Sequence, residues 1–349
     1  MYHFCTKKID FFVYMYIFYY LCIVFLQFIP FCIHMKLFQK LFKKDDNFGI
    51  IVSQNSKFDI ADVQNYNQIL RLDIDNLIIP KPLLTQADPF LFVNGKILYL
   101  FFESQRSGER GVIRMKKTEN LKDWTKPITV LREPFHLSFP FVFEYNGNVY
   151  MIPETQASDS IRLYRGNDDL TDFTLERVLI SKQRTDEVKF NYCDSHLLKK
   201  DGVWFLFSSI AYNWTYYLEL YYSDDLHHDF IKHPASPIYV GNDFGRSGGS
   251  IIHFNDDYYR ISQNCSKSYG ANISVHQITS LDENVYQEEL VKQDLLNVGV
   301  GKYRDGGHHL NIVKYGDKYI YATDYRHVSW CWYQLYLKLK KIFKCCEFF

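Results

Sequence analysis

Three carboxylic acids stand at the ends of short apolar segments, where they could do acid–base chemistry. Asp88 lies before a proline in ADPFLF, Asp194 lies in NYCDSHLL, and Glu154 closes YMIPE. Chemistry at a glycosidic bond needs two carboxyl groups, one as proton donor and one as base or nucleophile. These three residues are therefore the candidate catalytic residues. A structural role stays open for each, because a carboxylate at a strand start also accepts unpaired backbone N–H groups.

Basic, hydroxyl and aromatic side chains near the same segments could bind a ligand. Arg246 could pair with one of the acids, either to hold two strands together or to grip an anionic group. Histidine pairs can bind metal ions or sugar hydroxyls but more often make ordinary hydrogen bonds, and we predict no metal and no cofactor. The predicted substrate-binding residues are His136, Ser138, Arg246, Tyr269, Tyr303, His308 and His309, and further aromatic residues suited to stacking on sugars are Phe139, Tyr192 and Trp214.

A hairpin unit that recurs five times would position these residues. The copies read ADPFLFVNGKILYLFFE, SFPFVFEYNGNVYMIPET, CDSHLLKKDGVWFLFSS, GGSIIHFNDDYYRISQ and HHLNIVKYGDKYIYATD. Asn-Gly and Asp-Gly between apolar segments are strong signals for a two-residue hairpin turn. The second strand of each copy ends in a polar residue, in turn Glu103, Glu154, Ser209, Gln263 and Asp324.

The spacing of these units predicts an all-β, five-bladed β-propeller over residues 81–327. Comparable positions lie 50, 56, 52 and 62 residues apart, at Asp88, Ser138, Asp194, Arg246 and His308. Repeats of about 50 residues with several strands each are typical of propeller blades. We expect residues 35–80 to form a lead-in that supplies a closing strand. The starts of the innermost strands would then meet around one axis, while Glu103, on an outward-running strand, would only brace its blade.

The composition excludes some partner classes. Formal net charge is zero, and no basic stripe crosses the body of the sequence, so nucleic acid is not an expected partner. Hydrophobic residues make up 47% of the chain, enough for a large core. The eight cysteines include no CxxC pair, which weakly favours a reduced compartment over a disulfide framework or a zinc site.

The two ends of the chain differ from its body. Residues 1–34 are either a transmembrane segment or an upstream stretch before a true start at Met35, and both interpretations stay open. We expect the main domain in the cytoplasm under both interpretations, because the lysines after residue 34 would keep it there even if the segment spans a membrane. Membrane association of the domain stays open, and a single-pass membrane protein is the alternative. Residues 328–349 form an aromatic and lysine-rich tail, predicted as an amphipathic helix that contacts a membrane surface or packs on the domain.

Two of the blade starts resemble those of the five-bladed glycosidases of families 43 and 32. That resemblance implies a first-blade aspartate as general base, matched by Asp88, and a third-blade aspartate that tunes the acid, matched by Asp194. The general acid of those families is a fourth-blade glutamate, but the fourth copy here reads GRSGGS, with Arg246 and no glutamate. Ordinary glycoside hydrolysis is therefore not the first expectation.

A more specific resemblance covers about residues 81–326. The motifs ADPFLF, HLSFPFVF, YMIPE, GRSGGS, YYRISQNCSKSYG and YRDGGHHLN together resemble the N-terminal domain of plant glucosamine inositolphosphorylceramide transferases and their bacterial relatives. In the plant proteins a family 64 glycosyltransferase domain follows, and we expect this chain to lack it, since the last hairpin lies near the end of the printed sequence. The resemblance implies a role in glycan or glycolipid assembly.

We therefore predict a carbohydrate-engaging propeller, acting as an accessory or glycan-binding protein in the biosynthesis of a cell-surface polysaccharide or glycolipid. Its expected partners are a glycan or glycolipid and a separate glycosyltransferase. An enzyme acting on a glycosidic bond through Asp88, Asp194 and Glu154 is the first alternative, and a ligand-free scaffold is the second.

Overall fold

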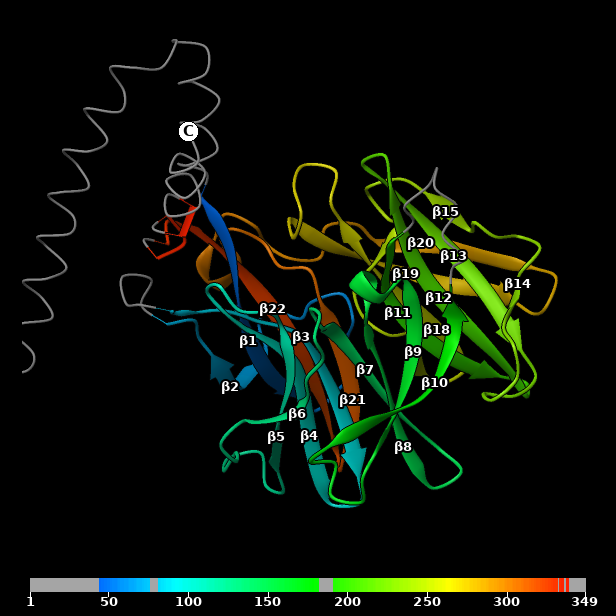
Figure 1. The fold of residues 1–349 in the computed structure, drawn as a ribbon, viewed down its shortest axis with the longest axis horizontal. Helices are drawn as coiled ribbons and strands as arrows, with labels where there is room; N and C mark the ends of the chain where they lie inside the picture. The colour runs from blue at the N-terminus through cyan, green and yellow to red at the C-terminus, as the bar shows by residue number, and fades with distance from the viewer. Residues whose placement is uncertain (1–43, 76–80, 182–190, 332, 336, 339–349) are drawn as a thin grey trace, which may run out of the picture. The chain divides into compact units, whose positions relative to one another are not determined.

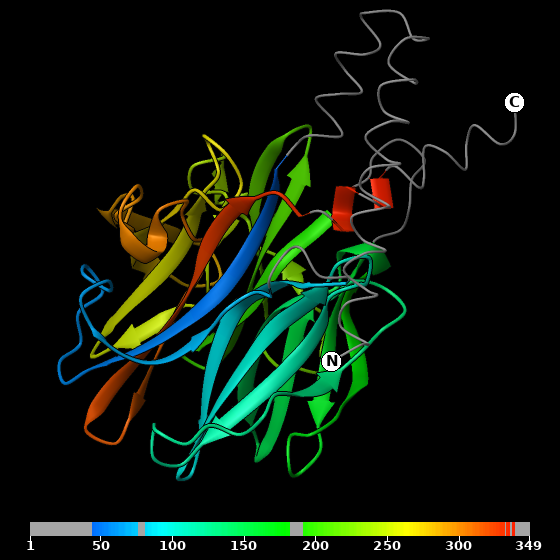
Figure 2. The same ribbon diagram turned by 90° about the vertical axis from the view of Figure 1, so that its left-hand side faces the viewer.

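The computed structural model describes residues 44–75, 81–181, 191–331, 333–335 and 337–338. In these residues nearly all regular structure is β-strand, arranged in four sheets (Figures 1 and 2). Two short 3₁₀ helices, Gln156–Ser158 and Gly301–Tyr303, lie in connections. Residues Asp46–Ser329 form one compact unit, which contains all the strands after β1.

The largest sheet joins the first hairpin region to the last one. Its strands run in the order β21, β22, β1, β3, β4, β5, β6, with β2 paired to β1. The two groups meet at one parallel pair, Phe48 with Thr85. The strands are β1 (Asp45–Asn55), β2 (Asn67–Leu72), β3 (Leu83–Asn94), β4 (Ile97–Arg106), β5 (Val112–Thr118), β6 (Ile128–Leu131), β21 (Leu310–Tyr315) and β22 (Lys318–Ser329).

The other three sheets are antiparallel and follow the chain order. The second contains β7 (Ser138–Tyr145), β8 (Asn148–Glu154), β9 (Ser160–Gly166) and β10 (Phe173–Ser181). The third contains β11 (Asn191–Lys200), β12 (Val203–Tyr212), β13 (Thr215–Ser223), β14 (Ile231–Lys232) and β15 (Tyr239–Val240). The fourth contains β16 (Arg246–Ser247), β17 (Ile252–Phe254), β18 (Asp257–Asn264), β19 (Asn272–Leu281) and β20 (Tyr286–Lys292).

Five apolar clusters hold these groups of strands together in sequence. One joins β3–β6 to β7–β10, the next joins the second sheet to β11 and β12, and a third joins β12 and β13 to β19. A fourth packs β17–β19 against β21 and β22, and the fifth packs β1 and β22 against β3 and β4. Each fully buried aliphatic or aromatic side chain contributes about 1.5–3 kcal/mol. The last group of strands thus packs against the first.

The terminal predictions fall mostly outside the described residues. The predicted transmembrane segment, residues 1–34, lies wholly outside them. In the predicted tail helix, residues 333–335 and 337–338 are helical. Among the residues that the structure describes, no helix is both long and apolar enough to cross a bilayer.

Candidate functional site

Three strands are interrupted by a β-bulge at the same place, near the start of the strand. The register shifts between Ala87 and Phe90 in β3, between Ser138 and Phe141 in β7, and between Cys193 and His196 in β11. The bulged residues Asp88, Phe139 and Asp194 have φ of 50°, 45° and 50°. A non-glycine residue in this left-handed region is strained, and such strain gathers at functional sites, where a bulge redirects a side chain.

On one side of the site, His308 lies between two buried carboxylates. Its Nδ1 is 2.8 Å from Oδ2 of Asp324, and its Nε2 is 3.4 Å from Oδ1 of Asp88. Asp324 also accepts the backbone N–H groups of His308 and His309 at 2.7 and 3.1 Å, and that of Asp88 at 3.4 Å. Asp88 in turn accepts the backbone N–H of Phe139 at 3.1 Å.

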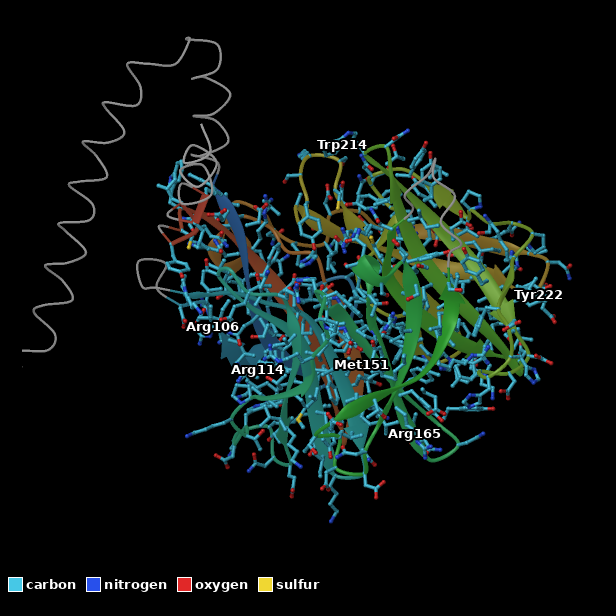
Figure 3. The ribbon with its side chains drawn as sticks, in the orientation of Figure 1. Arg106, Arg114, Met151, Arg165, Trp214 and Tyr222 are labelled. Atoms are coloured by element: carbon cyan, nitrogen blue, oxygen red, sulfur yellow. The ribbon has the colours of Figure 1, made fainter. Side chains whose placement is uncertain are left out.

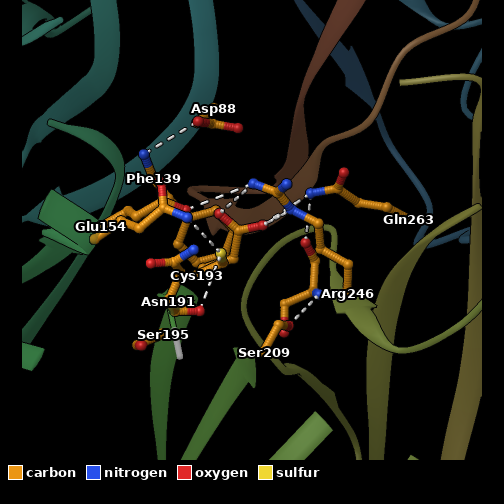
Figure 4. A network of polar contacts seen from close by, with 12 residues as sticks. Asp88, Phe139, Glu154, Asn191, Cys193, Ser195, Ser209, Arg246 and Gln263 are labelled. Atoms are coloured by element: carbon orange, nitrogen blue, oxygen red, sulfur yellow. Dashed lines mark hydrogen bonds and ion pairs between the residues drawn. The ribbon is translucent and has the colours of Figure 1, made fainter. Parts of the chain in front are cut away.

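On the other side, Arg246 lies beside two acids (Figure 4). Two tyrosine rings also contact it. Its Nε is 2.6 Å from Oδ2 of Asp194, and its Nη2 is 3.5 Å from Oε2 of Glu154. Its guanidinium lies 5.3 Å from the ring centre of Tyr216 and 4.9 Å from that of Tyr269, within cation–π range. The Arg246 side chain is 13% exposed, so the cation is largely shielded from water.

Burial and crowding shift the protonation of these groups. Burial, helped by the negative charge of Asp194, raises the pKa of Glu154 to about 8 despite the nearby Arg246. Burial raises the pKa of Asp88 to about 7, against the opposing effect of His308. Burial would lower the pKa of His308, but the carboxylates of Asp324 and Asp88 raise it to about 9. At neutral pH the site thus holds a protonated Glu154 beside a charged arginine and a charged imidazole.

Glu103 and His136 form a further pair at the same ends of the strands. Oε1 of Glu103 is 3.3 Å from Nε2 of His136, and Glu103 is buried while the imidazole side chain is 40% exposed. Burial would lower the pKa of His136, but the hydrogen bond and charge of Glu103 raise it. The charge of Glu103 also raises the pKa of Asp88, so Glu103 acts on the site electrostatically.

The sequence matches the family described as "Glucosamine inositolphosphorylceramide transferase 1, N-terminal" over residues 42–324. The chain belongs to this family. It is 34% identical over 241 residues to glucosamine inositolphosphorylceramide transferase 1 of Oryza sativa subsp. japonica, and 32% identical over 239 residues to that of Arabidopsis thaliana. The alignments cover 66% and 65% of this chain but only 30% of each relative, so the chain spans about a third of their length.

Solved structures with a similar fold are carbohydrate-active enzymes. The α-L-arabinofuranosidase PaAbf62A of Podospora anserina matches with a TM-score of 0.53 at 11% identity, covering 66% of this chain and 77% of that chain. The family 62 catalytic domain of Coprinopsis cinerea matches with a TM-score of 0.51 at 9% identity, covering 68% and 90%. At these identities the likeness concerns the fold alone, and it supports the predicted β-propeller of the glycosidase type.

The structure brings together most of the residues that the sequence analysis selected in this family member. Asp88, Asp194, Glu154, Arg246, His308 and Tyr269 form one connected cluster of ion pairs and ring contacts. Ser138 is buried and pairs with Glu154 in the sheet register, and His136 lies at the rim of the cluster through Glu103.

Two selected residues are placed differently. Tyr303 is 1% exposed inside an apolar cluster, where its hydroxyl lies 2.6 Å from Oγ1 of Thr323. His309 is fully buried, its ring centre 4.6 Å from that of Phe90, and neither ring nitrogen has a hydrogen-bond partner among the described residues. Burial lowers the pKa of His309 to about 3, which keeps it neutral. Nδ1 of His309 lies 3.7 Å from Oδ1 of Asp88, so this ring borders the cluster from inside the fold.

The sequence analysis assigned no site role to four residues that the structure places in the cluster. Asp324 fixes His308, Glu103 pairs with His136, and Tyr216 contacts Arg246. Gln263 donates from Nε2 to Oδ2 of Asp194 at 3.0 Å and to the Ser247 carbonyl at 2.7 Å. Three of these residues, Glu103, Gln263 and Asp324, are the polar residues that close the second strand of a hairpin, and this recurrence was the available signal.

One group of ligand atoms could hold a cation. Atoms of Asp88, His308 and Asp324 all lie within 4.8 Å of one another. Both oxygens of Asp324 already face N–H donors, and both nitrogens of His308 already face carboxylates. The donors and acceptors of the three residues thus already satisfy one another, as a carboxylate–imidazolium–carboxylate chain.

Proposed function

We propose that the domain binds the glycan part of a glycolipid or cell-surface polysaccharide at the cluster around Arg246, as an accessory to a separate glycosyltransferase. Membership of a family named for glucosamine inositolphosphorylceramide transferases supports carbohydrate as the ligand class. We further propose five blades, with β3–β6 and β21, β22, β1 and β2 as two separate blades, since among the described residues a single backbone pair, Phe48 with Thr85, joins the two groups in the sheet.

The position of Arg246 is the observation that carries this proposal. In the glycosidases that the sequence resembles, the fourth blade supplies the proton donor, whereas here it supplies a cation that pairs with Asp194 at 2.6 Å. Because a cation stands where those families place their proton donor, the arrangement favours binding over bond cleavage.

The chemistry of the remaining groups suits a hydroxyl-rich ligand. Arg246, Tyr216 and protonated Glu154 offer hydrogen-bond donors, and Asp194 offers acceptors. The ring of Tyr269 is 37% exposed and supported by Arg246, which suits packing against a sugar ring. Few precisely placed polar groups beside aromatic rings are typical of small-molecule sites.

One observation favours a second candidate, an enzyme acting on a glycosidic bond. Oε2 of Glu154 is buried and accepts no hydrogen bond from any described residue. A carboxyl group that stays protonated to about pH 8 has the property that a general acid needs. In this candidate Glu154 donates a proton to the leaving oxygen and Asp88 acts as the base.

Glycan binding by the full chain tests both candidates. The full chain and its Asp88→Asn and Arg246→Gln variants would be probed on an array of oligosaccharides of one to eight units that includes glucosamine-containing glycans. Binding that is lost in Arg246→Gln, without release of any sugar product, supports the accessory role. Product release that disappears in Asp88→Asn while binding persists supports the enzyme.

The third candidate, a ligand-free scaffold, is also decided by the array. If the folded full chain binds no glycan and releases no product, the carbohydrate proposal is wrong and the scaffold stands. Flotation of the full chain with phosphatidylcholine vesicles, compared with a chain cut before residue 329, tests the proposed membrane contact of the tail. Equal flotation of the two would contradict that contact.

A further inference from the structure

Trp214 is placed in full contact with water at the tip of the β12–β13 hairpin (Figure 3). Its exposed fraction is 97%, whereas Trp204, on the preceding strand, is 4% exposed within an apolar cluster. Burying a large aromatic ring stabilises a folded chain, so a fully exposed tryptophan is uncommon. Packing therefore gives no reason for a tryptophan at this position.

The backbone gives no reason either, as the other two-residue turns of the same type show. Tyr212 pairs with Thr215, so Asn213 and Trp214 form the turn, with φ of 47° and 64°. Two other hairpins have the same two positive φ values, at Asn146–Gly147 and at Asp201–Gly202. Both carry glycine at the second position, which is the residue this turn prefers. A tryptophan there is strained, and strain of this kind is kept where it serves a function.

The backbone of the tip is hydrogen-bonded to a neighbouring loop in spite of this strain. Nδ2 of Asn242 donates to the Trp214 carbonyl at 2.8 Å, and the Asn242 carbonyl accepts the backbone N–H of Cys265 at 2.7 Å. Two residues along the chain, the Tyr216 carbonyl accepts the backbone N–H of Gly241 at 2.9 Å. The loop around Asn242 thus anchors the backbone from which the tryptophan side chain projects into water.

The same hairpin reaches the cluster around Arg246. The hydroxyl of Tyr216 accepts a hydrogen bond from Nη1 of Arg246 at 3.2 Å, and the ring of Tyr216 lies against the guanidinium. Trp214 precedes Tyr216 by two residues, so the exposed ring lies at the same end of the hairpin as the tyrosine that contacts Arg246. A ligand that leaves the cluster along this hairpin would meet the tryptophan.

We propose that Trp214 is an outer subsite that stacks on a sugar ring of an oligosaccharide whose inner end occupies the cluster around Arg246. This inference rests on the proposed glycan binding and adds that the ligand is an oligomer, because a single sugar does not extend from Arg246 past Tyr216 to the tip. Tryptophan suits such a role because it offers a large contact area and has only two rotatable side-chain bonds, so little conformational freedom is lost on binding.

The test compares ligand length with the residue at position 214. The best-binding glycan of the array and its truncations down to one sugar would be titrated into the full chain and into Trp214→Gly, Trp214→Phe and Ile231→Ala, the last replacing an exposed apolar residue on β14. We expect Trp214→Gly to weaken binding of the longer glycan roughly tenfold and to leave the shortest truncation unchanged, with Trp214→Phe intermediate and Ile231→Ala unchanged.

The stability of the same variants makes the result interpretable. Because glycine fits the left-handed turn, Trp214→Gly should fold and raise the Tm by roughly 2 °C, which excludes misfolding as the cause of weaker binding. If Trp214→Gly binds glycans of every length as the parent chain does, the subsite is wrong although glycan binding stands. If its only effect is reduced flotation with vesicles, the ring is a membrane contact and the subsite is again wrong. If neither the parent chain nor any variant binds glycans, the proposed function is wrong, and so is the subsite.

Discussion

Two buried arginines on neighbouring strands, Arg246 on β16 and Arg260 on β18, differ in how well their partners are satisfied. Nε and Nη2 of Arg260 bind the two oxygens of Glu288 at 2.6 and 2.5 Å, and its Nη1 donates to the Phe244 carbonyl at 3.1 Å. Burial alone would raise the pKa of Glu288, but Arg260 lowers it to about 2. This is a closed pair with fork-to-fork geometry.

Arg246 also contacts both oxygens of one carboxylate, through Nε to Oδ2 of Asp194 at 2.6 Å and through Nη2 to Oδ1 at 3.4 Å, but a second acid lies beside it. That acid is Glu154, 3.5 Å from Nη2, and burial raises its pKa to about 8 rather than leaving it lowered. Among the described residues, Glu154 Oε2 has no hydrogen-bond partner. An arginine that is fully paired with one acid stabilises the fold. A second acid beside an arginine leaves hydrogen-bond donors and acceptors that a ligand can use.

The largest expected effect is on the closed pair. Replacing Glu288→Gln leaves the charge of Arg260, which is 0% exposed, without a counter-charge. Breaking a buried pair from one side costs about 3–5 kcal/mol, so the free energy of unfolding in urea should fall by roughly 3 kcal/mol, with glycan binding unchanged. The double variant Arg260→Met with Glu288→Leu is the control and should recover most of the loss. A Glu288→Gln chain of parental stability would contradict the structural role.

The second largest effect is expected at Arg246, where a substitution should weaken glycan binding more than it lowers stability. Arg246→Gln should weaken glycan binding by about tenfold or more, because charge-assisted hydrogen bonds to the ligand are lost. It should cost roughly 1–2 kcal/mol of stability, less than Glu288→Gln, because Asp194 keeps the hydrogen bond from Gln263. Arg246→Lys keeps the charge without the fork and should be intermediate in binding. A loss of stability larger than that of Glu288→Gln, with binding intact, would make Arg246 the structural arginine.

The third effect is a difference in pH dependence between the two acids. The pKa of Glu154 rises from 4.5 to about 8, so the folded chain keeps a proton that the unfolded chain releases. Stability from this group is present below pH 4.5 and is lost as the pH rises toward 8, whereas the lowered pKa of Glu288 gives stability that is lost as the pH falls toward 2. Between pH 5 and 8 the stability of the parent chain should fall, and Glu154→Gln should remove about 3 kcal/mol of that fall, measured by urea unfolding.

Part of the fall in the free energy of unfolding between pH 5 and 8 should remain in Glu154→Gln. The raised pKa values of Asp88 and His308 act in the same direction, because both groups hold protons in the folded chain that are released on unfolding. Glu288→Gln is the matched control and should keep the parental slope over this window. Parallel curves for Glu154→Gln and the parent chain would mean that Glu154 is ionised in the folded state.

The difference between the two arginines also marks what the sequence could predict. Hairpin turns such as Asn146–Gly147 are local, and their regular recurrence was enough to predict an all-β fold built from repeated units. The convergence of Asp88, Asp194 and Arg246 followed from that fold. By contrast, Arg260 lies inside YYRISQ with nothing nearby to mark its partner, Glu288, which is 28 residues away.

The bulges explain why other parts of the site were not predicted. One extra residue in a strand reverses which side chains face the site after it. Ser138 seemed to correspond to Asp88, but the bulged residue of β7 with the left-handed φ is Phe139. Glu103 was expected only to brace its blade, yet it pairs with Ala87 directly before the bulge of β3 and therefore reaches the site. Strand alternation alone carries no information on either point.

The smallest expected effects come from two hydroxyl groups that occupy matching places in the two clusters. The Tyr286 hydroxyl donates to Oε2 of Glu288 at 2.5 Å, and the Tyr216 hydroxyl accepts from Nη1 of Arg246 at 3.2 Å. Tyr286→Phe should cost about 1 kcal/mol of stability and leave glycan binding unchanged, because a short bond to a charged group is lost. Tyr216→Phe should cost only about 0.5 kcal/mol, since Arg246 keeps its contacts with Asp194, but should weaken glycan binding roughly threefold. Urea unfolding measures the stability that each variant loses, and glycan titration measures the affinity that it loses. If both variants lose stability and affinity in the same proportion, the distinction between the pair at Arg260 and the site around Arg246 is wrong.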